Sequence, residues 1–439
     1  MTKFTKTVSC IMMASLILFI VFANAFTSNA TITLTENQVK APIEKYIAES
    51  LKKYDTRTKS TISFNNIVDN NSSFYQYAKQ LTTLTNNRYK SFQSLKLDKV
   101  NYYIEYTSFK KCENSYNIEA NVYEEKKYSD SNIPGYVCTK HKFTLKSLKN
   151  KAIIVNDVTN SVEEQYLQHN SKSDKMVVSK AISTDNINIQ NELKRSKALS
   201  FNNKSNNHNL IIKKVNKSNF GLLSKDSSNY SNNNYTATES TNTTFKKGKY
   251  HKYNFNFNKM YQYAEKYNAS SPKKKANRNT NYANFDNMGG DCTNYVSQIL
   301  RAGGAPLDTT GNYQWYYHKI TDRSPSWTAP ASAWLSGDIK PCVNQLCNYL
   351  IHNDYIGPQG SIIKYDQPYA ASKGDIIQVK FNGKKTFTHS LWITRHQTGT
   401  TSCTRIACHS NDRWEDKLDS IPGSKRWIKL KGYGKISWK

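Results

Sequence analysis

A long polar stretch constrains this chain more than any other feature, because it cannot bury a core. Residues 161–249 are dominated by Ser, Asn, Lys and Thr, and the run from residue 227 reads Ser-Ser-Asn-Tyr-Ser-Asn-Asn-Asn. Few apolar side chains are available there to offset the conformational entropy lost on ordering. We therefore expect a flexible linker between a domain at 31–160 and a second domain at 250–439, which would let the second domain move widely around the first.

A targeting segment precedes the first domain. Lys3 and Lys6 come before an apolar run at 8–22, and Ala23-Asn24-Ala25 has the small-x-small pattern of a cleavage site. These features predict a secretory signal peptide at 1–25, with an uncleaved membrane anchor as the alternative. We expect a secreted or cell-surface protein that contacts a membrane only through this segment, if it stays uncleaved.

The chain is strongly basic, with a formal net charge of +29. Such a charge attracts polyanions. A signal peptide argues against nucleic acid as the partner and favours anionic wall polymers or lipid head groups. The abundance of Asn, Lys, Tyr and Ile is typical of an AT-rich genome, so part of this charge reflects composition alone.

The first domain has patterns of both kinds of secondary structure. Helical spacing of apolar residues predicts helices at 39–54 and 73–92. Alternating residues then predict four strands, at 100–106, 116–123, 136–145 and 152–158. Helices followed by an antiparallel meander indicate a small α+β domain, with a curved sheet of the cystatin-like or nuclear-transport-factor-like kind. No catalytic constellation is visible in it.

The second domain is organised around a cysteine at the point where a loop turns into a helix. Gly289 and Gly290 permit a tight bend, and Asp291 is a favourable N-cap. Apolar residues then recur at helical spacing, at Tyr295, Val296, Ile299 and Leu300. Cys292 would lie in the first turn, where the helix dipole favours the nucleophilic thiolate. A cysteine that is merely buried or disulfide-bonded is the alternative.

Further elements follow the cysteine helix and supply a possible base. Helical patterns lie at 257–267 and 341–352, and strand patterns at 375–381, 389–394, 405–409 and 426–430, with a hairpin signal at Asn382-Gly383. His389 begins one strand and His409 ends the next. A thiolate nucleophile needs a base, and the base needs a group that orients its ring. This order of cysteine, strand histidine and later polar residue is that of papain-like hydrolases.

Aromatic residues gather in the loop-rich stretch 307–337, among them Trp315, Trp327 and Trp334. They could line a groove for sugar rings or peptide. Packing of an irregular loop onto the core is the commoner reason for such residues.

The remaining cysteines allow two readings. Of the eight, Cys10 lies in the signal peptide, which leaves an odd number. Cys112 and Cys138 would fall at opposite ends of the meander strands, too far apart for a disulfide, so either the meander is wrong or they pair elsewhere. The pairs Cys342/Cys347 and Cys403/Cys408 could hold zinc together with His409, but their spacing is wider than structural zinc sites favour. Disulfides between the two pairs are the better expectation, and no metal or cofactor is predicted.

Several short segments carry a resemblance to a known family. They are 289–298 (Gly-Gly-Asp-Cys-Thr-Asn-Tyr-Val-Ser-Gln), Gly303-Gly304, 374–377, His389-Ser390 and 409–413, with Tyr267, Asn268, Tyr282 and Phe285 leading in. Together they closely resemble the bacterial putative amidase domain family, which is similar to the NlpC/P60 and CHAP cell-wall hydrolases. The resemblance covers about residues 250–439. It implies a papain-like α+β fold in which the cysteine helix packs on an antiparallel sheet.

The resemblance also implies roles for individual residues. Cys292 would be the nucleophile, His389 the base and His409 the orienting residue, with Asn411 and Asp412 as rivals for that third place. The backbone N–H of Cys292 would hold part of the oxyanion, and Asp291 and Trp315 are the candidates for positioning the substrate.

The expected function is thus cysteine-dependent hydrolysis of peptide or amide bonds in the peptidoglycan of a Gram-positive envelope. A non-catalytic protein that binds or scaffolds the envelope is one alternative. A papain-like acyltransferase that uses the same residues is another.

Overall fold

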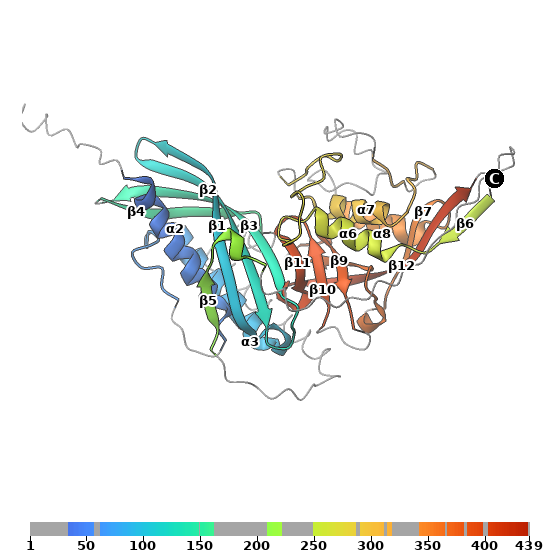
Figure 1. Cartoon of the computed structure of the whole chain (residues 1–439), viewed down its shortest axis with the longest axis horizontal. Coiled ribbons are helices and arrows are strands. Elements are labelled where there is room, and N and C mark those ends of the chain that lie inside the picture. Colours follow the sequence, from blue (N-terminus) through green and yellow to red (C-terminus); the bar gives the residue numbers. More distant parts are fainter. Residues whose placement is uncertain are drawn as a thin grey trace, which may run out of the picture.

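The computed structural model describes residues 34–56, 62–148, 150–161, 209–221, 249–286, 290–310, 314–317, 342–364, 367–381, 384–397 and 403–437 (Figure 1). The predicted signal peptide, most of the predicted linker and the turn Asn382-Gly383 lie outside these residues. Within them, no helix is both long and apolar enough to cross a membrane.

The amino-terminal part has the predicted helices and strands. Two helices cover one face of an antiparallel sheet, namely α2 (Glu36–Leu51) and α3 (Ser73–Ser91) over β1 (Leu97–Cys112), β2 (Ser115–Tyr128), β3 (Gly135–Leu148) and β4 (Lys151–Thr159). Thr35 and Gln38 form a capping box that starts α2. Because Val39, Ile43 and Ile47 recur at helical spacing, one face of α2 is buried in the core of this part.

Part of the predicted linker is a strand, so the prediction of an unstructured stretch is wrong there. Within residues 209–221, β5 (Ile211–Lys214) pairs in parallel with β1. Phe220 packs edge-on against the rings of Tyr103 and Tyr136. Two adjacent isoleucines and one phenylalanine attach this polar segment, because the isoleucines pair with the edge of β1 and Phe220 packs on an aromatic cluster.

The carboxy-terminal part is a second α+β unit. Its helices are α6 (Phe257–Lys266), α7 (Cys292–Ala302) and α8 (Cys342–His352), as expected. Its strands are β6 (Lys249–Tyr253), β7 (Gly357–Ile362), β8 (Ile376–Lys380), β9 (His389–Arg395), β10 (Arg405–Cys408), β11 (Asp412–Lys417) and β12 (Ser424–Ser437). The helices lie on one face of the sheet (Figure 1). Tyr295, Val296 and Ile299 of α7 share a buried cluster with Trp392 of β9, so the cysteine helix does pack on an antiparallel sheet.

The two parts share one sheet, which runs β5-β1-β2-β3-β11-β10-β9-β8-β12-β6. The junction is an antiparallel ladder in which Cys138, Val137 and Tyr136 of β3 lie opposite Asp412, Arg413 and Trp414 of β11. Farther along, β3 pairs with β4. The expectation that the second domain moves freely around the first is therefore wrong for this structure, because backbone hydrogen bonds fix one part on the other.

Charged side chains are buried at this junction. Asp416, which is fully buried, accepts hydrogen bonds from Tyr128 and Arg413 and lies 3.7 Å from the ammonium group of Lys126. Lys417, also buried, donates to Asp130. Each buried charge thus has an opposite charge beside it, as burial requires.

The described cysteines are thiols, and none forms a disulfide. Cys112 and Cys138 are both thiols although the predicted meander is present, so the expectation that they pair elsewhere is wrong. Among the described cysteines, the expected pairing of Cys347 with Cys403 or Cys408 is not found, and the side chain of Cys342 lies outside the described part of the chain. Cys347, in α8, packs in the cluster between the helices and the sheet, whereas Cys408 lies in the cluster on the opposite face of the sheet. The sheet therefore separates these two sulfur atoms.

Replacing Asp416 tests the charged junction. Burial alone would raise the pKa of Asp416, but Lys126 and Arg413 lower it to about 2. Its contribution to stability is therefore present above the unfolded carboxyl pKa of about 3.9 and is lost as pH falls through the folded value. Asp416→Asn should cost about 3 kcal/mol at pH 7, because it removes the carboxylate that binds the buried Arg413 and one of the two carboxylates beside the buried Lys126.

Thermal unfolding of both proteins between pH 2 and 8 measures this. The difference in Tm should be largest above pH 5 and should shrink below pH 4. Glu119→Gln, which removes an exposed ion pair to Lys142, is the control and should change stability by less than about 0.5 kcal/mol. An Asp416→Asn protein as stable as the control would show that the junction does not depend on this carboxylate.

Candidate active site

The loop before α7 bends where the glycine motif predicts. Gly290 has φ of +115°, and a Cβ atom there would lie 2.9 Å from the hydroxyl oxygen of Ser410. That hydroxyl accepts a hydrogen bond of 2.7 Å from the backbone N–H of Asp291. A side chain at Gly290 would therefore be strained and would also displace the residue that holds the start of the helix.

Cys292 is the first residue of α7, and its thiol is buried, with 4% of the residue exposed. The backbone N–H of Ser390 donates to the sulfur, and the Thr293 hydroxyl lies 3.8 Å from it. Burial raises the pKa of the thiol, these donors lower it, and the carboxylate of Asp291 raises it. The net shift is upward, so the expectation that the helix start favours a resting thiolate is wrong. Burial of the sulfur is the largest of these effects, and it favours the neutral thiol.

His389 begins β9 and is buried, with its ring centroid 6.1 Å from that of Phe381. Its neighbour Ser390 contacts the cysteine helix twice, through the backbone N–H and through a hydroxyl 3.1 Å from that of Thr293. The structure thus brings the start of the Cys292 helix against the start of the His389 strand.

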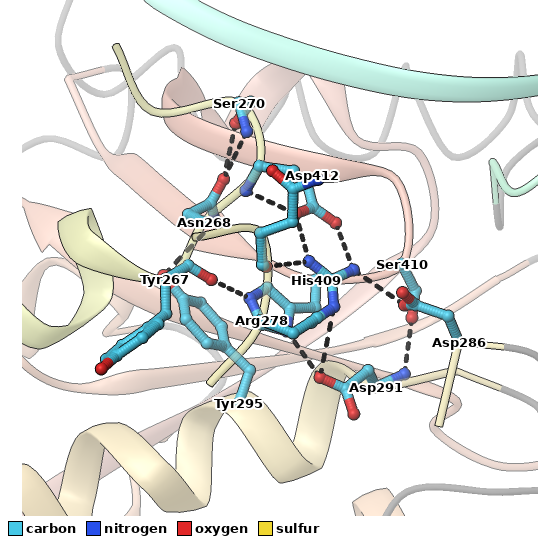
Figure 2. Close-up of polar contacts among 12 residues, drawn as sticks. Tyr267, Asn268, Ser270, Arg278, Asp286, Asp291, Tyr295, His409, Ser410 and Asp412 are labelled. Carbon is cyan, nitrogen blue, oxygen red and sulfur yellow. Dashed lines mark hydrogen bonds and ion pairs between the residues drawn. The ribbon is translucent and has the colours of Figure 1, made fainter. Parts of the chain in front are cut away.

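The ring nitrogens of His409 contact Asp291 and Tyr267. Its Nδ1 lies 2.6 Å from Oδ2 of Asp291, and its Nε2 lies 2.7 Å from the carbonyl oxygen of Tyr267. The ring also stacks on Tyr295, with centroids 3.7 Å apart (Figure 2). Both ring nitrogens are engaged, and neither contact is with His389. An orienting bond from His409 to His389 would therefore require one of these two bonds to break.

The rival residues also have partners of their own. Asn411 accepts a hydrogen bond of 2.9 Å from Thr139 of β3. Asp412 accepts hydrogen bonds from both terminal nitrogens of Arg278, at 2.6 and 2.8 Å, and from the backbone N–H of Ala269. Arg278 also binds Asp286 at 2.8 Å (Figure 2). None of these contacts is with His389.

The two candidates for substrate positioning are both buried. Asp291 is the N-cap residue, but its side chain does not cap the helix. It accepts instead from the backbone N–H of Phe285 and from the amide of Asn294. Trp315 is fully buried and donates to Ser297, so it packs into the core, which was the alternative for the aromatic loop.

Arg278 is the charged residue of this region that sequence reasoning missed. Its guanidinium lies within hydrogen-bonding or ion-pair distance of Asp286, Asp291 and Asp412. Nothing in the local sequence singles it out, because its partners come from both sides of the cysteine motif. Among the described residues, no group of three or more histidine, cysteine, aspartate and glutamate side chains is arranged to hold a metal ion.

Alkylation of Cys292 tests its raised pKa. With iodoacetamide, the pH at which the rate is half-maximal should lie above the ordinary thiol value of about 8.5, because burial favours the neutral form. Peptide mapping by mass spectrometry after timed labelling measures it, with the exposed Cys112 as the reference in the same sample. A midpoint near or below pH 7 would instead show that a thiolate persists at rest.

The comparisons with known proteins give one match, in the carboxy-terminal part. Residues 252–433 match the model of a protein family described as "putative amidase domain". No curated protein matches the chain, and no solved structure matches it. The matched stretch contains Cys292, His389 and the network around His409, whereas the amino-terminal part lies outside it. Residues 252–433 are therefore similar to the putative amidase domain family, and this match supports an amidase-like hydrolase at the level of the family.

Proposed function

We propose that the protein is a cysteine hydrolase that cleaves amide bonds with Cys292 as nucleophile and His389 as base. One observation carries this proposal. Within the stretch that matches an amidase family, a helix that begins with a cysteine meets a strand that begins with a histidine, and Ser390 joins them.

The raised pKa of the Cys292 thiol shapes the chemistry. His389 takes the thiol proton as the sulfur attacks the carbonyl carbon, so that the thiolate forms only when substrate is in place. The developing oxyanion accepts a hydrogen bond from the backbone N–H of Cys292, which lies at the positive end of α7. His389 then returns the proton to the leaving amine, and water releases the acyl group from the sulfur.

Peptidoglycan is the substrate that we propose, in peptide or amide bonds of a Gram-positive envelope. The family resemblance to wall hydrolases, the predicted signal peptide and the net charge of +29 support this substrate and a secreted or surface-attached location. Anionic wall polymers would be attracted by the same charge.

Digestion of purified peptidoglycan tests the proposal. The full-length mature protein, in reducing buffer, should release fragments with new amine termini that mass spectrometry identifies. Cys292→Ala and His389→Gln should each lower the rate by about 10⁴-fold, because nucleophile and base act as a unit. Cys403→Ala, a half-buried thiol on the loop between β9 and β10, is the matched control and should keep its activity.

The other outcomes are equally informative. Equal and empty profiles for all four proteins, with the fold intact by circular dichroism, would refute the wall-hydrolase proposal and favour an envelope-binding role. Products in which the acyl group has moved to an added amine would identify an acyltransferase with the same nucleophile.

A further inference from the structure

The residue next to the proposed nucleophile belongs to a buried network of charges. Asp291 precedes Cys292 and is 1% exposed. One of its carboxylate oxygens accepts from Phe285 and Asn294, and the other lies 2.6 Å from His409. These contacts fix the backbone immediately before the sulfur, so a change in the network moves Cys292.

Both ring nitrogens of His409 face oxygen atoms, and an imidazolium ion beside an ionised Asp291 satisfies both contacts. The carboxylate oxygen beside its Nδ1 and the carbonyl oxygen of Tyr267 beside its Nε2 are both acceptors. A neutral imidazole has one N–H and could satisfy only one of them. The positive charge is matched by Asp291 and by the face of the Tyr295 ring on which His409 stacks.

Arg278 binds two further carboxylates of the same network. It donates two hydrogen bonds to Asp412 and one to Asp286. Although burial raises the pKa of Asp286, Arg278 and Lys140 hold it below its ordinary value. Two cations, His409 and Arg278, thus hold three carboxylates in fixed places around the start of α7 (Figure 2).

The amino-terminal domain holds the other side of this network. Thr139 of β3 donates to Asn411, which lies in the turn directly after His409 and Ser410. Lys140, the next residue of β3, lies 3.3 Å from Asp286. The backbone ladder also places Cys138 opposite Asp412. Three consecutive residues of one strand therefore lie against this region: Thr139 contacts the turn, Lys140 contacts Asp286, and Cys138 pairs through the backbone with Asp412.

We propose that the amino-terminal domain is a positioning partner of the active site, acting through β3 on the His409–Asp291 pair and thereby on Cys292. His409 is a positioning residue in its imidazolium form. The proposal deepens the proposed function, since it takes Cys292 as the nucleophile, but it also predicts properties of the thiol that do not depend on any substrate.

Four single substitutions on β3 of the full-length protein test the contact between the two domains. Thr139→Val and Lys140→Gln remove the two side-chain contacts to the amidase domain. Thr144→Val and Lys142→Gln are the matched controls, because these side chains contact Asn117 and Glu119 of β2 within the same domain. Thr139→Val and Lys140→Gln should each lower kcat on peptidoglycan by about 10-fold with little change in KM, because each disturbs the position of the Cys292 sulfur. The control pair should leave kcat unchanged.

Iodoacetamide labelling of Cys292 in the same four proteins gives a readout without substrate. Thr139→Val and Lys140→Gln should change the labelling rate at pH 8 at least threefold, and the controls should not. Equal labelling and equal kcat in all four proteins would overturn the proposal. If labelling changes but no protein digests peptidoglycan, the positioning role stands and the proposed function fails. Since Lys140 is half-exposed, its variant should fold even if Thr139→Val does not.

Nuclear magnetic resonance of the ¹⁵N-histidine-labelled protein tests the charge on His409. Its two ring nitrogens should both carry protons, because both face oxygen acceptors, and the resonances are assigned by their loss in His409→Gln. A neutral tautomer of His409 in the unmodified protein would contradict the positioning role that we assign to it.

Discussion

The ladder between β3 and β11 is the interaction on which the rest of this structure depends. It covers only three residue pairs, yet it converts two α+β units into one sheet and places the amino-terminal domain against the site. Backbone hydrogen bonds are directional, so the ladder sets the rotation of one unit on the other as well as their contact. The side-chain contacts of Thr139, Lys140 and Tyr128 all follow from that single registration.

The cost of this arrangement is a buried polar junction. Every residue of β11 is buried although its sequence reads Asp-Arg-Trp-Glu-Asp-Lys. Such a strand is tolerated only when each charge has a partner, and the partners come from both units. An apolar junction would have bound more simply, but paired charges accept only one orientation. Positioning of Cys292 in the proposed hydrolase needs this kind of orientation.

Much of the fold follows from residue periodicity, whereas the polar junction does not. The helices at α2, α3, α6, α7 and α8 and the strands β1–β4, β8–β10 and β12 have apolar patterns that the sequence displays. β5 was missed because two isoleucines stand in a polar stretch, and β7 because Gly357, Pro358 and Gly360 resemble a loop. β11 was missed because burial of charges depends on partners such as Lys126 and Tyr128, hundreds of residues away in the chain.

The same distinction applies to the candidate site. A glycine pair, a capping position and helical spacing identify Cys292, because those signals are local. The contacts of His409 with Tyr267 and Asp291 are formed between segments far apart in sequence, and histidine spacing alone could not separate this placement from one beside His389. The raised pKa of the Cys292 thiol could not be predicted from the sequence either, because desolvation depends on the packing of the whole domain.

The shared sheet also bears on how copies of this protein behave at high concentration. An exposed strand edge is a template for pairing with another chain. The amidase domain alone would present β11 as such an edge, and β3 covers it. The two strands that end the combined sheet, β5 and β6, are short and carry lysines, at Lys213, Lys214, Lys249 and Lys252. Charge on these two strands opposes edge-to-edge association there.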